Sequence, residues 1–206
     1  GITRIDGHES LRKRTNEPLL NALEQMGCYV EGEGGGLPVE IKGPVMGSGI
    51  SIAGNISSQY VTALLLISPF INREKNVVIN ITGDLVSKPY IDITVNEMRK
   101  RGLRIRWSGS RHLVVESGSY SDGEYSIEGD ATAASYFSAI ATIHNSSVNF
   151  PNLGSNTVQG DYFFFEVMEQ LGAKVEREDQ STNVSGSIQL EGLGELDMNN
   201  HPDVAL

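Results

Sequence analysis

Apolar positions recur along this chain at two spacings, one typical of helices and one typical of strands. Leucines and other apolar residues follow helical spacing from Leu19 to Met26, and Gly27 comes directly after them. Because glycine tolerates the positive φ that is common just past the end of a helix, this pattern predicts a helix that ends at Gly27. Similar patterns predict further helices over residues 57–68, 88–101, 131–143 and 160–171.

Short runs rich in β-branched and aromatic residues, separated by Gly, Ser and Asn, predict strands between these helices. The predicted strands cover residues 39–41, 50–52, 77–81, 103–107 and 112–115. Within one block the order is strand, helix, strand, helix and then two further strands. This βαβαββ order predicts a mixed sheet with helices packed on one side, an α/β or α+β fold.

The sequence pattern that opens such a block occurs twice, and a weaker version of it occurs a third time. Residues 51–58 and 126–133 both open an apolar helical run, and residues 196–203 form a weaker third version. Helices are also predicted to end at three glycines, Gly27, Gly102 and Gly172. A period of roughly 70 to 75 residues is too long for a solenoid repeat and indicates a domain-sized building block that is used repeatedly.

The composition indicates a folded chain, because 39% hydrophobic and 20% charged residues over 206 positions suffice for one or two globular cores. The net charge of -10 argues against a general surface for nucleic acid or anionic membranes, so an anionic substrate would need a local basic pocket. The longest apolar run, residues 61–67, is too short to span a bilayer, and no signal-like leader precedes it. These features predict a cytoplasmic protein.

Cysteine and histidine usage gives no metal motif. Cys28 is the only cysteine, which excludes an intrachain disulfide or a cysteine zinc cluster and fits a buried small apolar residue in a reducing compartment. The four histidines form no H-x-x-x-H pair, and no phosphate-binding or dinucleotide-binding glycine motif stands between a strand and a helix. The glycines of residues 32–37 instead predict a hairpin loop, so nucleotide hydrolysis and dinucleotide redox chemistry are disfavoured.

Two predicted helix starts carry candidate binding residues. In residues 54–59 a glycine permits close backbone approach, and Ser57 and Ser58 place hydroxyls beside the free N–H groups of a helix N-terminus, as a phosphate or carboxylate site requires. At the second start Ser87 stands at the predicted N-cap, and Tyr90 is able to stack on or hydrogen-bond a ring-shaped ligand. Both segments also fit a plainer interpretation, with ordinary caps and an amphipathic tyrosine lying over the core.

Charged candidates lie at the two ends of the chain. Residues 12–14, Arg-Lys-Arg, offer guanidinium groups for an anion but equally fit a solvated face. Asp203 occupies the helix-start position of the third block, where it fits either a catalytic carboxylate or an N-cap. His201, beside Pro202, is weak evidence for a metal or acid–base role.

A resemblance to a known family rests on four segments in chain order, residues 54–60, 83–94, 128–137 and 197–203. Together they resemble the 5-enolpyruvylshikimate-3-phosphate synthase family over essentially the whole chain. The resemblance implies the inside-out barrel fold of enolpyruvyl transferases, in which two similar domains each contain three βαβαββ units. It also implies that this chain is an internal piece, with residues 1–127 in the first domain and residues 128–206 forming the first part of the second.

The resemblance also implies which residues bind the two substrates. Those that match contacts to shikimate 3-phosphate are Ser57, Ser58, Gln59, Ser87, Tyr90 and Asp203. Arg14 matches an arginine that binds phosphoenolpyruvate, and Gln59 matches a second contact to this substrate. The match at Arg14 departs from the family pattern in the next residue, because Thr15 stands where the family usually has proline. Asp203 matches the carboxylate that takes the proton from the attacking 5-hydroxyl group.

The implied reaction transfers the carboxyvinyl group of phosphoenolpyruvate to the 5-hydroxyl group of shikimate 3-phosphate and releases phosphate. It uses no metal and no organic cofactor. Lysine and arginine segments that complete the anion clamp in the family have no counterpart in this chain. We therefore expect the isolated chain to be weakly active or inactive.

Two alternatives stay open. UDP-N-acetylglucosamine enolpyruvyl transferase shares the fold and the class of chemistry, but it lacks a segment like residues 87–90, and nothing here resembles its reactive cysteine loop. The other alternative is a noncatalytic module that binds the missing remainder of an enzyme or associates with itself. An exposed apolar face would be evidence for that second alternative.

Overall fold

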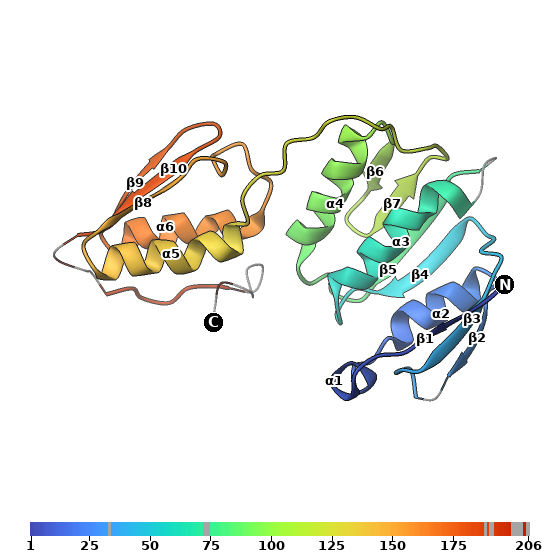
Figure 1. The fold of residues 1–206 in the computed structure, drawn as a ribbon. Helices are drawn as coiled ribbons and strands as arrows, with labels where there is room; N and C mark the ends of the chain where they lie inside the picture. Colours follow the sequence, from blue (N-terminus) through green and yellow to red (C-terminus); the bar gives the residue numbers. More distant parts are fainter. Residues whose placement is uncertain (33, 72–74, 188, 190–191, 199–203, 205–206) are drawn as a thin grey trace. The chain divides into compact units, whose positions relative to one another are not determined.

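The computed structural model describes residues 1–206 except residues 33, 72–74, 188, 190–191, 199–203 and 205–206. The chain divides into two compact units, Gly1–Asp122 and Gly123–Leu206 (Figure 1). Each unit has an apolar core of its own.

The first unit combines two sheets with helices. Its elements in chain order are β1 (Ile2–Ile5), α1 (Glu9–Arg12), α2 (Glu17–Gln25), β2 (Tyr29–Gly32), β3 (Val39–Lys42), β4 (Gly49–Ala53), α3 (Ser58–Ile71), β5 (Val77–Thr82), α4 (Lys88–Lys100), β6 (Ile105–Ser108) and β7 (His112–Val115). One sheet is antiparallel and has the order β1-β3-β2. The other has the order β4-β5-β7-β6, in which β4 and β5 run parallel and β7 is antiparallel to both of its neighbours.

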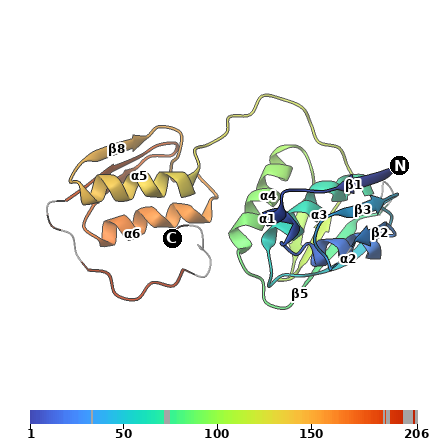
Figure 2. The same ribbon diagram turned by 60° about the horizontal axis from the view of Figure 1, so that its bottom comes forward.

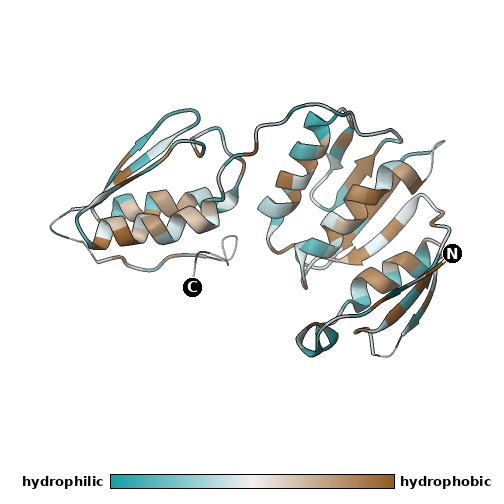
Figure 3. Cartoon of the chain, viewed as in Figure 1, coloured by the Kyte–Doolittle hydropathy of each residue, from teal (hydrophilic) through white to brown (hydrophobic). Residues whose placement is uncertain are grey.

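Helices cover one face of this four-stranded sheet, as the sequence predicts. Burial alternates along β4 and β5, so that Ile52 and Ile79 lie in the core while Ser51 is exposed. α2 packs on β4, α3 packs on β5 and β7, and α4 packs on α3 and β6. Figure 3 shows apolar residues concentrated in α3 and in the strands that it covers.

The second unit repeats part of this plan around a smaller core. Its elements are α5 (Ala131–Ile143), β8 (Ser147–Phe150), the 3-10 helix η1 (Gly160–Phe163), α6 (Phe164–Gln170), β9 (Lys174–Arg177) and β10 (Thr182–Ser185). The antiparallel sheet has the order β8-β10-β9, and α5 and α6 pack side by side (Figure 2). Phe165, Leu153 and Val184 are almost fully buried between the helices and the strands.

The same strand order recurs in every sheet of the described residues. In β1-β3-β2, β5-β7-β6 and β8-β10-β9 the last strand of the trio lies between the two earlier ones. Elements β4 to β7, with α3 and α4, form one complete βαβαββ unit. The predicted fold class and its repeated unit are therefore confirmed.

Most predicted boundaries lie within a few residues of the observed ones. Gly27, Gly102 and Gly172 have φ values of 85°, 87° and 98°, which confirms the predicted helix ends. The predicted hairpin loop joins β2 to β3, which pair antiparallel. The helix predicted over residues 160–171 is corrected, because its first turn, η1, has 3-10 geometry, a common form at helix starts.

Candidate functional site

The parallel pairing of β4 and β5 determines where the candidate residues meet. Each of these strands leads directly into a helix, β4 into α3 and β5 into α4. Because the carboxyl ends of parallel strands lie at one edge of a sheet, both helices begin at that edge. The loop before α3 is also hydrogen-bonded to the end of β5, since Gly54 N donates to Thr82 O at 2.9 Å, and to the loop before α4, since Val86 N donates to Gly54 O at 3.2 Å.

Gly54 is needed for this close approach. A Cβ atom at this position would lie 2.5 Å from the Cγ2 atom of Ile81 and 3.3 Å from the carbonyl oxygen of Asp84. The sequence predicts close backbone approach at this glycine. The described residues show that one partner in the approach is the chain's own loop before α4.

The start of α3 carries Ser57, Ser58 and Gln59. The hydroxyl oxygen of Ser57 accepts a hydrogen bond from Gln59 N at 3.2 Å, so Ser57 is an ordinary N-cap, as the plainer interpretation holds. A hydroxyl that accepts one bond still has its proton to donate, so the cap does not exclude contact with an anion. Ser58 is buried and Gln59 is exposed.

The start of α4 differs from an ordinary helix start. Ser87 occupies the predicted N-cap position, but its φ and ψ of 54° and 38° are left-handed, and its side chain makes no capping hydrogen bond. N-cap residues normally have extended backbone, which aims the side chain at the first free N–H groups. Tyr90, in the first turn, is half-buried, and its N–H group donates to Ser87 O at 3.2 Å.

Two of the three cations at residues 12–14 form ion pairs with nearby carboxylates. Arg12 donates two hydrogen bonds to Asp6, at 2.7 and 2.6 Å, and this contact lowers the pKa of the Asp6 carboxyl below its ordinary value. Lys13 pairs with Glu9 at 3.0 Å. Within the described part of the chain, no ion pair involves Arg14, which is exposed. The plainer interpretation therefore holds for Arg12 and Lys13, and Arg14 stays a candidate.

A third loop is tied to the start of α3. The hydroxyl group of Tyr60, in the first turn of α3, donates a short hydrogen bond to the carbonyl oxygen of Thr15, which follows Arg14. Thr62 and Thr94 bring α3 and α4 together further along, with 3.1 Å between their hydroxyl oxygens. Sequence reasoning missed Tyr60, because its contact spans 45 residues and leaves no local pattern.

The structure thus brings most of the predicted site residues to one edge of the first unit. These residues are Arg14, Ser57, Ser58, Gln59, Ser87 and Tyr90. Asp203 and His201 lie outside the described residues, so their predicted roles stay predictions.

The second unit holds the start of α5 in a dense set of hydrogen bonds. The Asp130 carboxylate accepts from Thr132 N at 2.9 Å, which makes Asp130 the N-cap of α5. The Thr132 hydroxyl donates to buried Asp161 at 2.5 Å. Gln159 donates to Gly129 O at 2.7 Å and accepts from the N–H group that follows Asp130. The segment at residues 128–137 is therefore fixed by structural contacts.

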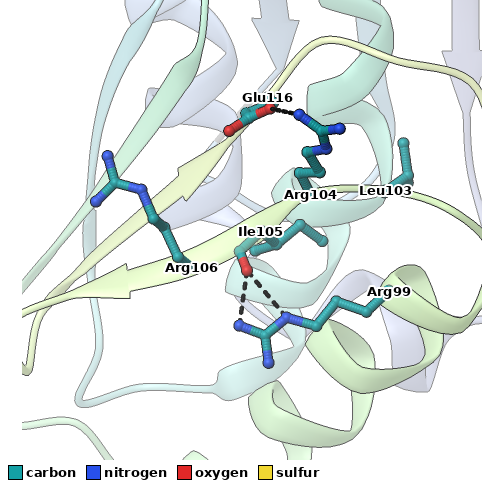
Figure 4. A pocket seen from close by; sticks show the side chains of 6 residues that line it. All are labelled: Arg99, Leu103, Arg104, Ile105, Arg106 and Glu116. Atoms are coloured by element: carbon teal, nitrogen blue, oxygen red, sulfur yellow. Dashed lines mark hydrogen bonds and ion pairs between the residues drawn. The ribbon is translucent and has the colours of Figure 1, made fainter.

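A separate surface pocket of about 290 Å³ lies between the end of α4 and the start of β6. Arginines dominate its lining, but their guanidinium groups point in different directions (Figure 4). Arg99 donates two hydrogen bonds to Ile105 O, at 2.9 and 2.6 Å, and Arg104 lies 3.7 Å from Glu116. Because these groups are not aimed at one point, the pocket is not a convergent anion site.

The structure also bears on the predictions for the cysteine, for metal binding and for membrane spans. Cys28 is a buried free thiol, and burial raises its pKa above the ordinary value, which confirms its interpretation as a buried residue. Within the residues that the structure describes, no group of three His, Cys, Asp or Glu side chains is placed to hold a metal ion. Within the same residues, every helix is too short or too polar to cross a membrane.

Comparison with known proteins identifies one family along the whole chain. The family model described as EPSP synthase (3-phosphoshikimate 1-carboxyvinyltransferase) matches residues 1–206. Relatives with the name 3-phosphoshikimate 1-carboxyvinyltransferase include those of Janthinobacterium sp. (strain Marseille), 36% identical over 211 residues, and Methanocaldococcus jannaschii, 34% identical over 207 residues. These matches cover 100% and 99% of this chain and 48% of each relative.

The fold matches solved structures in the same way. EPSP synthase from Acinetobacter baumannii superposes with a TM-score of 0.77 and 22% sequence identity, over 99% of this chain and 47% of that one. This match shows that the chain has the same fold as that enzyme. This chain spans about half the length of the curated relatives that it matches.

Proposed function

This chain belongs to the EPSP synthase family, and we propose that it forms part of a 3-phosphoshikimate 1-carboxyvinyltransferase. In the proposed reaction the methylene carbon of phosphoenolpyruvate is protonated, and the 5-hydroxyl oxygen of shikimate 3-phosphate bonds to the neighbouring carbon, C2. Loss of phosphate and of a proton from the new methyl group then restores the carbon–carbon double bond. The product is an enol ether, and inorganic phosphate is released.

The acceptor substrate is proposed to bind at the starts of α3 and α4. Ser57 and Ser58 donate hydroxyl protons to the phosphate of shikimate 3-phosphate, at the positive end of the α3 dipole. Gln59, Ser87 and Tyr90 supply further polar contacts to the same ligand. These side chains come from two segments, as a site that fixes the orientation of a small molecule requires.

The remaining proposed roles concern phosphoenolpyruvate and proton transfer. Arg14 binds an anionic group of phosphoenolpyruvate with its planar guanidinium group, together with Gln59. Asp203 takes the proton of the 5-hydroxyl group as this oxygen attacks. No metal or organic cofactor takes part in this proposal.

The observation that carries the proposal is that hydrogen bonds link three segments, namely the loop before α3, the loop before α4 and the segment at Arg14 and Thr15. Val86 N donates to Gly54 O, and Tyr60 donates its hydroxyl proton to Thr15 O. These bonds hold the candidate hydroxyls and the exposed Arg14 at one edge of one unit. A ligand with several anionic groups needs donors from separate segments, held in place before it binds.

The proposal also concerns the organisation of the whole enzyme. We assign residues 1–127 to its first domain and residues 128–206 to the start of its second, and the division into compact units at Asp122 supports this assignment. Because the relatives are about twice as long, the remainder of the enzyme is the expected partner, and the isolated chain is expected to turn over weakly. The proposed location is the cytoplasm.

Titration of the chain with shikimate 3-phosphate by calorimetry tests the acceptor site. The chain is expected to bind this ligand but not UDP-N-acetylglucosamine. The double variant Ser57→Ala, Ser58→Ala is expected to bind at least about a hundredfold more weakly, because each of the two lost hydrogen bonds to a charged group contributes about 1.5–3 kcal/mol. A matched control removes two exposed hydroxyls elsewhere in the same unit, Ser108→Ala with Ser110→Ala.

The outcomes separate the alternatives. Binding that persists in the first double variant would place the acceptor elsewhere. Preference for UDP-N-acetylglucosamine would favour the other enolpyruvyl transferase. A folded chain that binds neither ligand would contradict an acceptor site in this half of the enzyme and favour a noncatalytic module.

A further inference from the structure

A cluster of three side chains joins the first turns of α4 to strand β6. The Nζ atom of Lys88 lies 2.5 Å from the Oδ2 atom of Asp92, one turn later on α4. The other oxygen of Asp92, Oδ1, accepts a hydrogen bond from Nε1 of Trp107 at 2.9 Å. The ammonium group of Lys88 also lies over the Trp107 ring, 4.9 Å from its centroid. Each member therefore contacts both of the others.

The stability of α4 alone does not account for this cluster. Lys88 is the first residue of α4, where a positive charge faces the positive end of the helix dipole. A lysine placed before an acidic residue at this spacing is also the less favourable order. The side chains of Lys88 and Asp92 are 45% and 39% exposed, so their attraction is screened by water. The third partner, Trp107, is what distinguishes this pair from an ordinary surface pair.

Trp107 anchors the cluster to the sheet of the first unit. It lies on β6, and its side chain packs against the apolar core of the first unit. The hydrogen bond from its indole therefore ties the first turns of α4 to the sheet, across 15 positions of sequence. A cation over an indole ring adds an attraction that holds Lys88 in the same place.

Ser87 directly precedes Lys88 and has the left-handed backbone described above, with no capping bond of its own. Such a conformation costs free energy for a residue with a Cβ atom, so neighbouring contacts have to maintain it. The cluster holds the residue next to Ser87. It thereby limits how far the turn that contains Ser87 and Tyr90 is able to move.

We propose that Lys88, Asp92 and Trp107 are positioning residues that hold the turn from Ser87 to Tyr90 in the geometry that receives the anionic ligand. This inference rests on the proposed function, because it takes that turn as part of the acceptor site. The cluster acts through Ser87 and Tyr90 and does not itself contact the reacting atoms. It also makes Trp107 a reporter, since this is the only tryptophan of the chain and its indole is bonded to the helix that carries the turn.

The test uses the full chain and shikimate 3-phosphate, with affinity measured by calorimetry. Asp92→Asn keeps an oxygen that is able to accept from the indole but removes the charge that holds Lys88. Trp107→Phe keeps a ring but removes the donor, and Lys88→Met removes the cation at a partly exposed position. The matched control is Lys100→Met, which breaks a similar pair, Lys100 to Glu97 at 2.7 Å, at the other end of the same helix.

Each of the three cluster variants is expected to weaken binding by about tenfold, because a displaced contact residue loses much of its contribution. Lys100→Met is expected to stay within about twofold of the unchanged chain. Ligand binding is also expected to shift the emission of Trp107 in the unchanged chain, and Asp92→Asn is expected to reduce this shift. Thermal unfolding of every variant separates these effects from loss of the fold.

The possible results lead to distinct conclusions. Unchanged affinity in folded Lys88→Met and Asp92→Asn would overturn the positioning role and leave the proposed function standing. Equal losses in the cluster variants and in Lys100→Met would overturn it too, because a general effect of charge or helix stability would explain them. Absence of binding by the unchanged chain would overturn the proposed acceptor site and this inference with it.

Discussion

At the scale of single residues, backbone conformation at Ser87 is more informative than its place in the sequence. A serine before a helix normally caps it, yet the left-handed backbone here leaves the helix without that bond. Asp130, before α5, does cap its helix. Strained backbone at a residue whose side chain makes no capping bond is common at binding sites, where the surrounding fold holds the side chain for a ligand.

Replacing Ser87 with glycine is expected to stabilise the first unit but weaken ligand binding. Relief of the left-handed strain contributes roughly 1–2 kcal/mol, and the greater freedom of glycine in the unfolded chain offsets about 0.5–1 kcal/mol of this gain. The free energy of unfolding should therefore rise by about 0.5 kcal/mol. Urea unfolding followed by Trp107 emission measures it, and calorimetry measures the expected loss of affinity for shikimate 3-phosphate.

Asn145 provides the control for this prediction. It is the other described non-glycine residue with a positive φ, 47°, and it lies just after the end of α5. Asn145→Gly should leave the affinity unchanged, because asparagine and glycine are both common at such helix ends. A destabilised Ser87→Gly variant would contradict the strain argument.

At the scale of elements, the two strand-to-helix connections depend on one another. The loop before α3 and the loop before α4 share the hydrogen bond from Val86 N to Gly54 O. Any change that pushes these loops apart displaces both helix starts. This dependence is a property of the parallel pair β4 and β5, since only parallel neighbours place both following helices at one edge.

Gly54→Ala is expected to destabilise the first unit by about 1–3 kcal/mol, the usual cost of inserting an atom into a filled site. The new Cβ atom would lie 2.5 Å from a buried side-chain atom of Ile81, so the strand or the loop has to shift. Affinity for shikimate 3-phosphate should fall as well. Urea unfolding and calorimetry report these two effects.

Gly49→Ala is the matched control on the same strand. Gly49 lies in β4, and a Cβ atom there would meet nothing within 4 Å. Its effect on the free energy of unfolding should stay within about 0.5 kcal/mol. Similar losses of unfolding free energy in both alanine variants would show that neither position tolerates a side chain. That result would contradict the explanation that close packing around Gly54 causes the destabilisation.

At the scale of the whole molecule, α5 has an unusual distribution of side chains. Small residues such as Ala134 and Ser138 face the core of the second unit. The bulky apolar side chains are 52–65% exposed, namely Tyr136, Phe137, Ile140 and Ile143. A row of bulky apolar side chains on one face of a helix is ordinarily covered by another part of the protein or by a partner. This face is the exposed apolar surface that the noncatalytic alternative calls for, and it equally suits contact with the remainder that the proposed function expects.

We expect the isolated chain to self-associate through this face of α5. The double variant Phe137→Glu, Ile140→Glu should lower the average mass measured by sedimentation velocity, because burying two carboxylates in an apolar contact is costly. The control places the same charges at exposed apolar positions of the second unit outside α5, Ile127→Glu with Val158→Glu. Equal effects of both double variants would assign the change to net charge, and a monomeric unchanged chain would contradict the prediction.

The sequence by itself determined five of the helical segments, the strands β3 to β7, the repetition of the unit and the family, whereas α1 and the strands β1, β2 and β8 to β10 were not predicted. Helix ends at Gly27, Gly102 and Gly172 and the β-branched strand runs are encoded locally, so they are readable from residues that are neighbours in the chain. The motifs that carry the family resemblance are also contiguous segments. For the same reason the helix at residues 131–143 could be predicted to the residue.

Only the tertiary structure decided how these segments combine. The bonds from Tyr60 to Thr15, from Val86 to Gly54 and from Trp107 to Asp92 join residues that are distant in sequence, and such contacts leave no periodic trace. Periodicity likewise does not reveal which face of α5 turns outward, because both faces lack charged side chains. The left-handed backbone at Ser87 was also decided by the tertiary structure, because serine does not favour this conformation by itself and the surrounding contacts have to maintain it.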